Sequence, residues 1–468
     1  MPRRRLVLGG IFAFVAAYAV FALAHMFPPA PYGIADDWRV FMGAAAVIGR
    51  GGNPYARMTL HVAEQLVDHY PHTQPALDNF TDLPVVGLLL RAFAWMPFWW
   101  SYAVFTAIGL AVSGVALRAW LSELGWVRRG AWILAALLSW PLLVGVFSGQ
   151  LDLLMLGGTV AALLLMRRGS PWLAGLCMVA VLLKPHILWP LPLLLWAAWA
   201  SEPALARRFA AAAVTTLAGG ALLGFLLVPH AFAFFPHVLR FAGQVDQVQP
   251  DLAGMPGLLL PLPGGHLAGD LLAALGAAGV IGLTVAAIRY PRLRALPAEH
   301  RSLIPLAGLA LWLALVPYAH PNDDVLLFPL VAVVIGRGGG ALDARWLLRG
   351  AVASVVLAGV FVVQPVAGAL LLVAAMAGGT VWRDRVPARA APALALAALT
   401  LLPAVWPFHL VPVSLTPVAA ALVAVAGLLG LRATALAPQP KETATTAEPG
   451  LGTTPGARRH GSVTAVSG

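Results

Sequence analysis

A chain of 468 residues that is 60% hydrophobic and only 10% charged, with a mean hydropathy of +0.84, cannot be a series of ordinary water-soluble domains. Its formal charge of +11 does not indicate nucleic-acid binding, because Lys and Arg form short clusters between apolar runs rather than one basic face with stacking aromatic residues. The single cysteine, Cys177, excludes an intramolecular disulfide bond.

Apolar runs of about 20 residues recur along the chain, beginning with LVLGGIFAFVAAYAVFALA at residues 6–24. They are apolar on every face and lack the alternation of strands, so they predict α-helices. The fold class is therefore an all-α, polytopic integral membrane protein with about 12–14 transmembrane helices, some of them short enough to be re-entrant. We expect spans near residues 6–25, 98–118, 131–147, 151–166, 171–183, 187–200, 209–228, 267–288, 302–316, 325–336, 350–364, 367–382, 390–405 and 413–431.

The basic clusters orient these spans, because cytoplasmic loops of membrane proteins are enriched in Lys and Arg. MPRRR and the run that follows could be a signal peptide, but the length of the run favours an uncleaved first span. We expect the protein to lie in the inner (plasma) membrane, with both termini in the cytoplasm. In this topology only six of the 30 Lys and Arg residues lie on the outer side: Arg39, Arg50, Arg57, Arg91, Lys184 and Arg240.

Two outer loops, residues 28–97 and 229–266, are long enough to have functions of their own. In the first, Leu60, Ala63, Val67 and Tyr70 form one stripe, which predicts an interfacial helix. The run 83–97 is too short to span and predicts a re-entrant or surface helix. The second loop has the composition of a lipid-facing or substrate-covering lid. Residues 1–435 then form the transmembrane domain, and 436–468 a disordered cytoplasmic tail.

Ionisable side chains at the outer ends of spans are candidates for a functional site, because charge at membrane depth is costly. Each also has a purely structural explanation. Asp36 could be a helix N-cap, Asp152 could cap the span after Gly149, Lys184 could extend to the interface, and His320 could lie in a solvated turn. The residues in question are Asp36, Asp37, Asp152, Lys184, His186, and His320 to Asp324.

Motifs for soluble nucleotide donors are absent from the sequence, which contains no GxxxxGK[ST] and no dinucleotide-binding GxGxxG in its strand–turn–helix context. No HExxH zinc motif occurs either, and paired aspartates alone are weak evidence for a divalent cation. We therefore expect no metal and no cofactor, and a substrate that arrives through the lipid.

Four segments resemble parts of glycosyltransferase family 87. DDWRVFMGAAAVIGRGGNPYA (36–56) resembles the first-loop signature of the family, with Asp37 four residues before Phe41 and with Tyr55 at its end. SGQLDLLML (148–156) and the later LLKPHI (182–187) look like its Gly-Gln and Lys-Pro elements, and PYAHPNDDV (317–325) occupies the place of its late His segment. NFTDLPVV (79–86) stands where the family has Tyr-Pro-Pro, and Tyr318 and Ala319 stand where it has Ser-Trp.

The resemblance implies a GT-C membrane glycosyltransferase that uses a polyprenyl-phosphate sugar, typically mannose, on the outer side of the membrane. Its partners would be that donor, a lipid or lipid-linked glycan acceptor and membrane lipids. Asp37 would be the general base of an inverting transfer. Residues that would contact the substrates are Asp36, Gln150, Asp152, Lys184, His186, His320 and Asp323.

Two other functions remain open at the level of the sequence. A transporter or lipid flippase would show two related halves and charges near the bilayer midplane, whereas here the halves differ and the charges lie at outer ends. A non-catalytic scaffold would not need Asp37, Lys184 and His320 to converge.

Overall fold

The computed structural model describes residues 35–68, 80–123, 140–242, 254–259 and 264–336, together with short pieces between 421 and 435. The expected spans at 6–25, 350–364, 367–382 and 390–405, most of the span at 413–431 and the tail at 436–468 lie outside the described residues.

Helices and turns make up the whole of the described chain, which contains no strand. Among the described residues, three helices are long and apolar enough to cross a membrane: α5 (Phe98–Glu123), α13 (Pro203–Leu227) and α16 (Gly265–Arg289). Their outward faces are apolar too, with Val115 70%, Leu226 70% and Leu275 62% exposed. Such faces need lipid rather than water around them. The prediction of an all-α membrane protein is confirmed.

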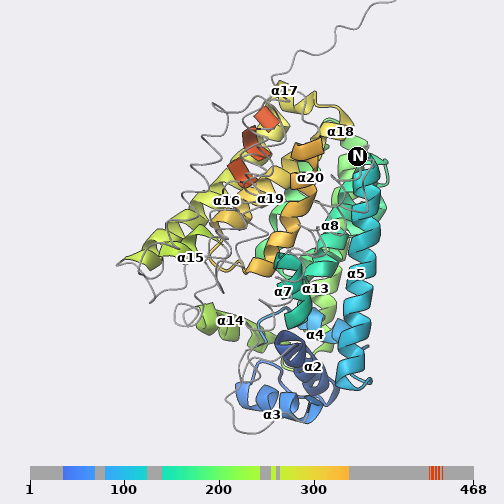
Figure 1. Cartoon of the computed structure of the whole chain (residues 1–468), viewed down its shortest axis with the longest axis vertical. Helices are drawn as coiled ribbons and strands as arrows, with labels where there is room; N and C mark the ends of the chain where they lie inside the picture. Colours follow the sequence, from blue (N-terminus) through green and yellow to red (C-terminus); the bar gives the residue numbers. More distant parts are fainter. Residues whose placement is uncertain are drawn as a thin grey trace, which may run out of the picture.

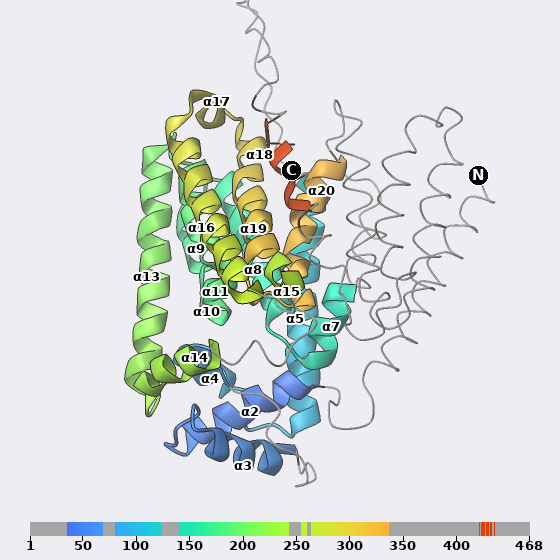
Figure 2. The ribbon, with the colours of Figure 1, turned by 90° about the vertical axis from the view of Figure 1, so that its left-hand side faces the viewer.

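Shorter apolar helices fill the space between the three long ones (Figure 2). Small residues let them approach closely, since a Cβ on Gly157 of α8 would lie 2.5 Å from Val112 of α5. These helices are α8 (Asp152–Arg167), α9 (Pro171–Leu176), α10 (Val179–Leu183), α11 (Pro185–Leu188), α12 (Pro190–Ala198), α19 (Leu303–Leu315) and α20 (Phe328–Gly336).

The two expected spans at 171–183 and 187–200 are each divided into two helices. A further break lies between these two spans, at Lys184. Its cause is clear, because the ring of a proline disfavours the helical conformation for the residue before it. Lys184 precedes Pro185 and has φ −141° and ψ 80°. The chain therefore turns at Lys184, between α10 and α11, and the ammonium group can leave the helix axis.

A separate group of helices covers one end of the bundle (Figure 1). It comprises α2 (Asp36–Gly49), α3 (Arg57–Asp68), α4 (Pro84–Leu90) and α14 (Phe234–Ala242), which follows a short turn, η1 (Ala231–Ala233). We call this the α2–α4 end. The short helices α17 (Pro291–Arg294) and α18 (Ala298–Arg301) lie at the opposite end (Figures 1 and 2).

The first predicted loop contains the helices expected from its sequence, but α3 packs differently. Leu60 and Ala63 are buried, and a Cβ on Gly43 of α2 would lie 3.3 Å from Leu60. The apolar stripe thus packs on α2 instead of facing the interface, because the small residues of α2 offer it a closer surface than lipid. Tyr70 lies outside the described residues. The run 83–97 forms the seven-residue α4 followed by turns, so it does not span.

Candidate active site at the α2–α4 end

The N-terminus of α2 is fixed against α7 (Trp140–Ser148) and the turn that follows it. Ala35, buried completely, adopts the left-handed conformation with φ 65° and donates its N–H to the carbonyl of Phe147 over 2.6 Å. A non-glycine residue pays an energetic penalty of about 1–2 kcal/mol for this conformation. The surrounding structure holds it there, as is common beside functional sites.

Trp38 provides the second attachment of α2. Its indole N–H donates to the hydroxyl of Ser101 over 2.9 Å, and its ring stacks on Phe105 at 4.3 Å. Gly149, with φ +78°, allows the turn after α7 to pass directly over this residue, because a Cβ there would lie 2.5 Å from the Cβ of Trp38. The Gly of the Gly-Gln element therefore serves the close approach of two segments far apart in sequence.

Asp36 and Asp37 form the first turn of α2, where the helix dipole favours negative charge. The N-cap residue is Ala35, so the expectation that Asp36 caps the helix is wrong by one residue. Asp36 instead accepts the N–H of Asp37 through its Oδ1 at 3.0 Å. This bond uses one of the N–H groups that a helix start leaves without an intrahelical partner.

A buried ion-pair network joins three segments beside this end of α2. The ammonium of Lys184 lies 3.1 Å from Oδ1 of Asp152, at the start of α8, and 3.0 Å from Oδ1 of Asp323 in η3 (Pro321–Leu327). Asn322 donates to the other carboxylate oxygen of Asp152 over 2.6 Å. The backbone N–H of His320 donates to Oδ2 of Asp323 over 2.8 Å. The side chains of Lys184, Asp152, Asp323 and Asn322 are all buried.

The contacts of this network exclude the purely structural roles that the sequence left open for Lys184, Asp152 and His320. Lys184 does not extend to the interface, since it is 6% exposed and its charge is compensated by two carboxylates. Asp152 does not cap α8, because the N-cap is Leu151 and the carboxylate bonds elsewhere. His320 is only partly exposed and forms a capping box with Asp323, so its turn is built into the protein.

The remaining predicted residues border the network. His186 has an exposed side chain and interacts electrostatically with Asp323, Lys184 and His320. The side-chain oxygen of Gln150 is buried and has no hydrogen-bond partner among the described residues. Asp36 interacts electrostatically with Tyr102 of α5. The structure thus joins Asp152, Lys184, His320 and Asp323 directly and places His186 within their field.

Asp82 belongs to the same group of charges and is absent from the sequence-based set. It lies in the segment before α4, is half-buried, and interacts electrostatically with Lys184, Asp37 and Asp152. Burial, opposed by the charge of Lys184 and aided by the charges of Asp37 and Asp152, raises the pKa of its carboxyl group to about 7. Asp82 is therefore within electrostatic range of both Asp37 and the buried network.

Tyr55 holds the Asp82 segment in place. Its hydroxyl donates to the backbone carbonyl of Asp82 over 3.0 Å, and its ring packs against Phe80 at 5.5 Å. Burial, with a smaller contribution from the charge of Asp82, raises the pKa of the Tyr55 hydroxyl, so it remains a neutral donor. On its other side the ring meets Phe234 and His237 of α14 at 5.8 and 5.7 Å. The end of the first-loop signature thus joins three separate segments.

Helix α14 presents apolar side chains outward beside this joint. Phe232 of the preceding turn is 72% exposed, and Phe235 and Leu239 are 51% and 76% exposed. His237 is on the buried side, where burial, together with the charge of Arg240, lowers the pKa of its imidazole. An amphipathic helix of this kind is typical of a membrane interface.

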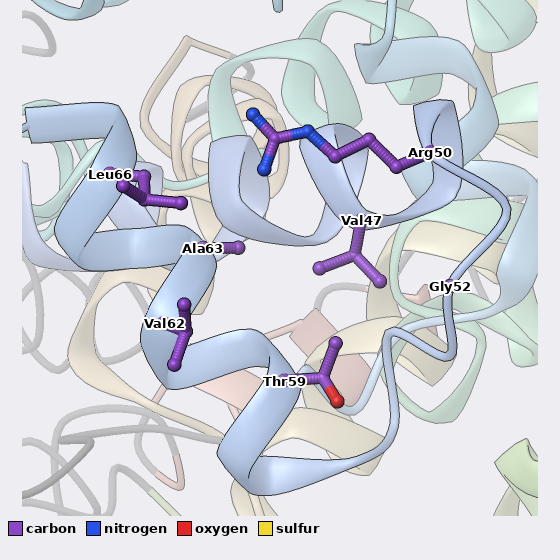
Figure 3. Close-up of a pocket in the computed structure, with 7 residues that line it drawn as sticks. All are labelled: Val47, Arg50, Gly52, Thr59, Val62, Ala63 and Leu66. Atoms are coloured by element: carbon purple, nitrogen blue, oxygen red, sulfur yellow. The ribbon is translucent and has the colours of Figure 1, made fainter.

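An apolar hollow of about 310 Å³ lies between α2 and α3 (Figure 3). Arg50 extends across it, and the other residues that line it are Val47, Gly52, Thr59, Val62, Ala63 and Leu66. A 14-residue helix is about 20 Å long, so this hollow is at the opposite end of α2 from Asp37. It contains no carboxylate and is distinct from the group of charges described above.

Within the described part of the chain, no group of three or more His, Cys, Asp or Glu side chains has the arrangement of a metal site. The missed residues Asp82 and Asn322 had weak signals in the sequence. Asp82 precedes a proline that starts a helix, and Asn322 is part of the polar run HPNDD.

Comparison with known protein families gives a match over about half of the chain. The sequence pattern that defines glycosyltransferase family 87 matches residues 80–317. No curated protein and no solved structure matches the chain. The matched region includes Asp82, Gln150, Asp152, Lys184 and His186, while Asp37 precedes it and His320 follows it.

Proposed function

Because the chain belongs to glycosyltransferase family 87, we propose that it transfers a hexose, specifically mannose, from a polyprenyl-phosphate sugar to a lipid or lipid-linked glycan. In this proposal the protein has a GT-C architecture, the reaction inverts the anomeric centre, and the active site is the group of charges at the α2–α4 end. Asp37 is the general base.

One observation carries the proposal. Charged groups from four separate segments lie within electrostatic range of one another in an otherwise apolar bundle: Asp37 on α2, Asp82 before α4, and the ion-paired Asp152 and Lys184. Charge buried beside membrane-spanning helices is costly and calls for a functional explanation. A lipid-borne donor and acceptor would reach this end of the bundle by lateral diffusion.

The chemistry follows from the residue types. Asp37 takes the proton of the acceptor hydroxyl as its oxygen forms a bond to the anomeric carbon. The bond from that carbon to the phosphate oxygen breaks, and its electron pair leaves with the polyprenyl phosphate. A base must lie within hydrogen-bond reach of the hydroxyl, and the first turn of a rigid, doubly anchored helix can provide that placement.

Negative charge grows on the departing phosphate, so positively charged groups or N–H hydrogen-bond donors are needed there to stabilise it. Lys184 is already compensated by Asp152 and Asp323. We therefore propose that Lys184, these two acids and Asn322 form a rigid scaffold beneath the site and do not contact the phosphate. In this proposal His186, whose side chain is exposed, and His320 donate to the phosphate, and Gln150 and Asp36 complete the substrate-contacting set.

The proposed side of the membrane is the extracytoplasmic one. The arginine cluster at 289–301, which includes α17 and α18, lies at the end of the bundle opposite to α2–α4 (Figure 2), and basic clusters mark the cytoplasmic face. We therefore propose a multi-pass protein of the inner (plasma) membrane with both termini in the cytoplasm. The transporter alternative is disfavoured by family membership.

Transfer of label tests this function. Membranes containing the full-length chain are supplied with polyprenyl-phosphate mannose carrying a radiolabelled sugar, and lipid and glycan fractions of the source cells serve as acceptors. We expect labelled product together with released polyprenyl phosphate. Nucleotide-linked mannose in membranes free of polyprenyl phosphate is the matched control and should give none. Transfer from the nucleotide sugar alone would refute the proposed donor.

A further inference from the structure

The apolar hollow between α2 and α3 has no role in the proposed transfer, because it lies at the opposite end of α2 from Asp37. Its walls include Val47 of α2 and Val62 and Leu66 of α3 (Figure 3). Val62 and Leu66 are 48% and 54% exposed, so the hollow opens to the surroundings along α3. A volume of about 310 Å³ is at the lower end of the range for small-molecule sites, which suits part of one hydrocarbon chain.

Two arginines place positive charge beside this hollow. Arg50 directly follows α2 and extends across the hollow (Figure 3). Arg91 directly follows α4, and its Nε would lie 3.8 Å from a Cβ on Gly49, the residue before Arg50. Both arginines are exposed, neither is ion-paired within the described ranges, and no acidic residue lines the hollow. The negative end of the α2 dipole favours cations here, but it does not require an apolar hollow next to them.

Exposed tryptophans indicate the depth of these arginines relative to a membrane. Trp95, four residues after Arg91, is 77% exposed, and Trp99 and Trp100 at the start of α5 are 54% and 69% exposed. Tryptophans at the end of a membrane-spanning helix are typical of the head-group layer. Arg91 and the neighbouring Arg50 therefore belong to the level at which lipid phosphates lie.

We propose that the hollow is a binding site for an anionic phospholipid, whose phosphate contacts Arg50 and Arg91. One acyl chain of this lipid lies against Val47, Val62 and Leu66. Guanidinium groups bind phosphate through paired, charge-assisted hydrogen bonds. Two cations without a neighbouring acid disfavour a zwitterionic phospholipid, because they repel its ammonium group. This site is separate from the transferase site, so its test does not depend on transfer of a sugar.

Photocrosslinking of the full-length protein in vesicles of phosphatidylcholine tests the site. Phosphatidylglycerol with a diazirine in one acyl chain is added in trace amount and compared with phosphatidylcholine that carries the same labelled chain. Mass spectrometry then measures the crosslinks on α3. We expect phosphatidylglycerol to label α3 at least about fivefold more than phosphatidylcholine does, because each arginine near a lipid head group contributes about a factor of five to binding of an anionic lipid.

Variants separate the two parts of the site. Arg50→Gln should lower labelling of α3 by phosphatidylglycerol about fivefold, and adding Arg91→Gln should abolish the preference for this lipid. Val62→Phe fills the hollow and keeps both charges, so it should reduce labelling by both lipids. Arg292→Gln, the matched control, removes an exposed charge on α17 at the opposite end of the bundle and should change nothing.

All four changes are at exposed side chains, so the melting temperatures in detergent should equal that of wild type. Labelling of α3 that is equal for the two lipids overturns the proposal. Labelling by phosphatidylglycerol that Arg50→Gln leaves unchanged, in a variant with the wild-type melting temperature, overturns it as well.

Discussion

Lys184→Met removes the only ammonium group of the buried network and leaves two carboxylates without their counter-charge. The ion pairs measure 3.1 Å to Asp152 and 3.0 Å to Asp323, and the three side chains are between 0% and 8% exposed. Loss of one partner of a buried pair costs about 3–5 kcal/mol. The hydrogen bonds from Asn322 and from the His320 backbone remain, so we expect a value within that range rather than the sum of two pairs.

Thermal unfolding of the detergent-purified protein, followed by tryptophan fluorescence, measures this loss. A change of 1 kcal/mol corresponds to about 2–4 °C for a chain of a few hundred residues, so the midpoint should fall by about 10 °C. The matched control is Arg168→Met, which breaks a pair of 2.8 Å to Glu123 whose arginine is 55% exposed, and which should cost at most about 1 kcal/mol.

A combined variant tests the cause. When Asp152→Asn and Asp323→Asn are added to Lys184→Met, no uncompensated charge is left in the network, and most of the lost stability should return. If Lys184→Met unfolds at the same temperature as wild type, or no lower than Arg168→Met does, the reasoning about a buried, compensated network is refuted.

Two further predictions concern neighbouring positions. Gly149→Ala should lower the stability far more than Gly51→Ala. Both glycines have φ +78°, but only at Gly149 would the new Cβ clash with another residue, the Cβ of Trp38 at 2.5 Å. Expression level and melting temperature measure the two effects, and equal effects would contradict the close approach of Gly149 to Trp38. Asp82→Asn should stabilise the protein, because the raised pKa means that the charged form is disfavoured in the folded state. The gain should be absent below about pH 4, grow as the pH rises to 7 and level off above it, so a gain that does not depend on pH in melting curves would be evidence against that burial.

The helices could be predicted from the sequence because lipid imposes a simple rule on composition. Long apolar runs such as α13 and α16 are recognisable without any tertiary information, and the extended residue before Pro185 follows from local sterics. The stripe of α3 shows where that rule ends. An apolar face indicates burial, but it does not say whether lipid or the small residues of α2 will cover it.

The residues of the candidate site could be predicted from the sequence better than the contacts between them. Charge at the ends of apolar runs drew attention to Asp37, Asp152, Lys184 and His320, whose roles remain predictions. The pairing of Lys184 with two acids depends on residues 32 and 139 positions away in the chain, which no local pattern encodes. Asp82 was missed for the same reason, since a single acid before a helix proline is ordinary until its neighbours in space are known.

The central claim is that Asp37 accepts the proton of the acceptor hydroxyl. Its most direct test is the transfer of labelled mannose from polyprenyl phosphate by full-length Asp37→Asn, an isosteric change that keeps the first turn of α2. We predict a loss of at least about 100-fold in kcat/KM, the usual contribution of a general base, with an unchanged melting temperature, while Asp270→Asn, which changes an exposed carboxylate on α16, retains wild-type transfer. Wild-type rates in Asp37→Asn would contradict the account.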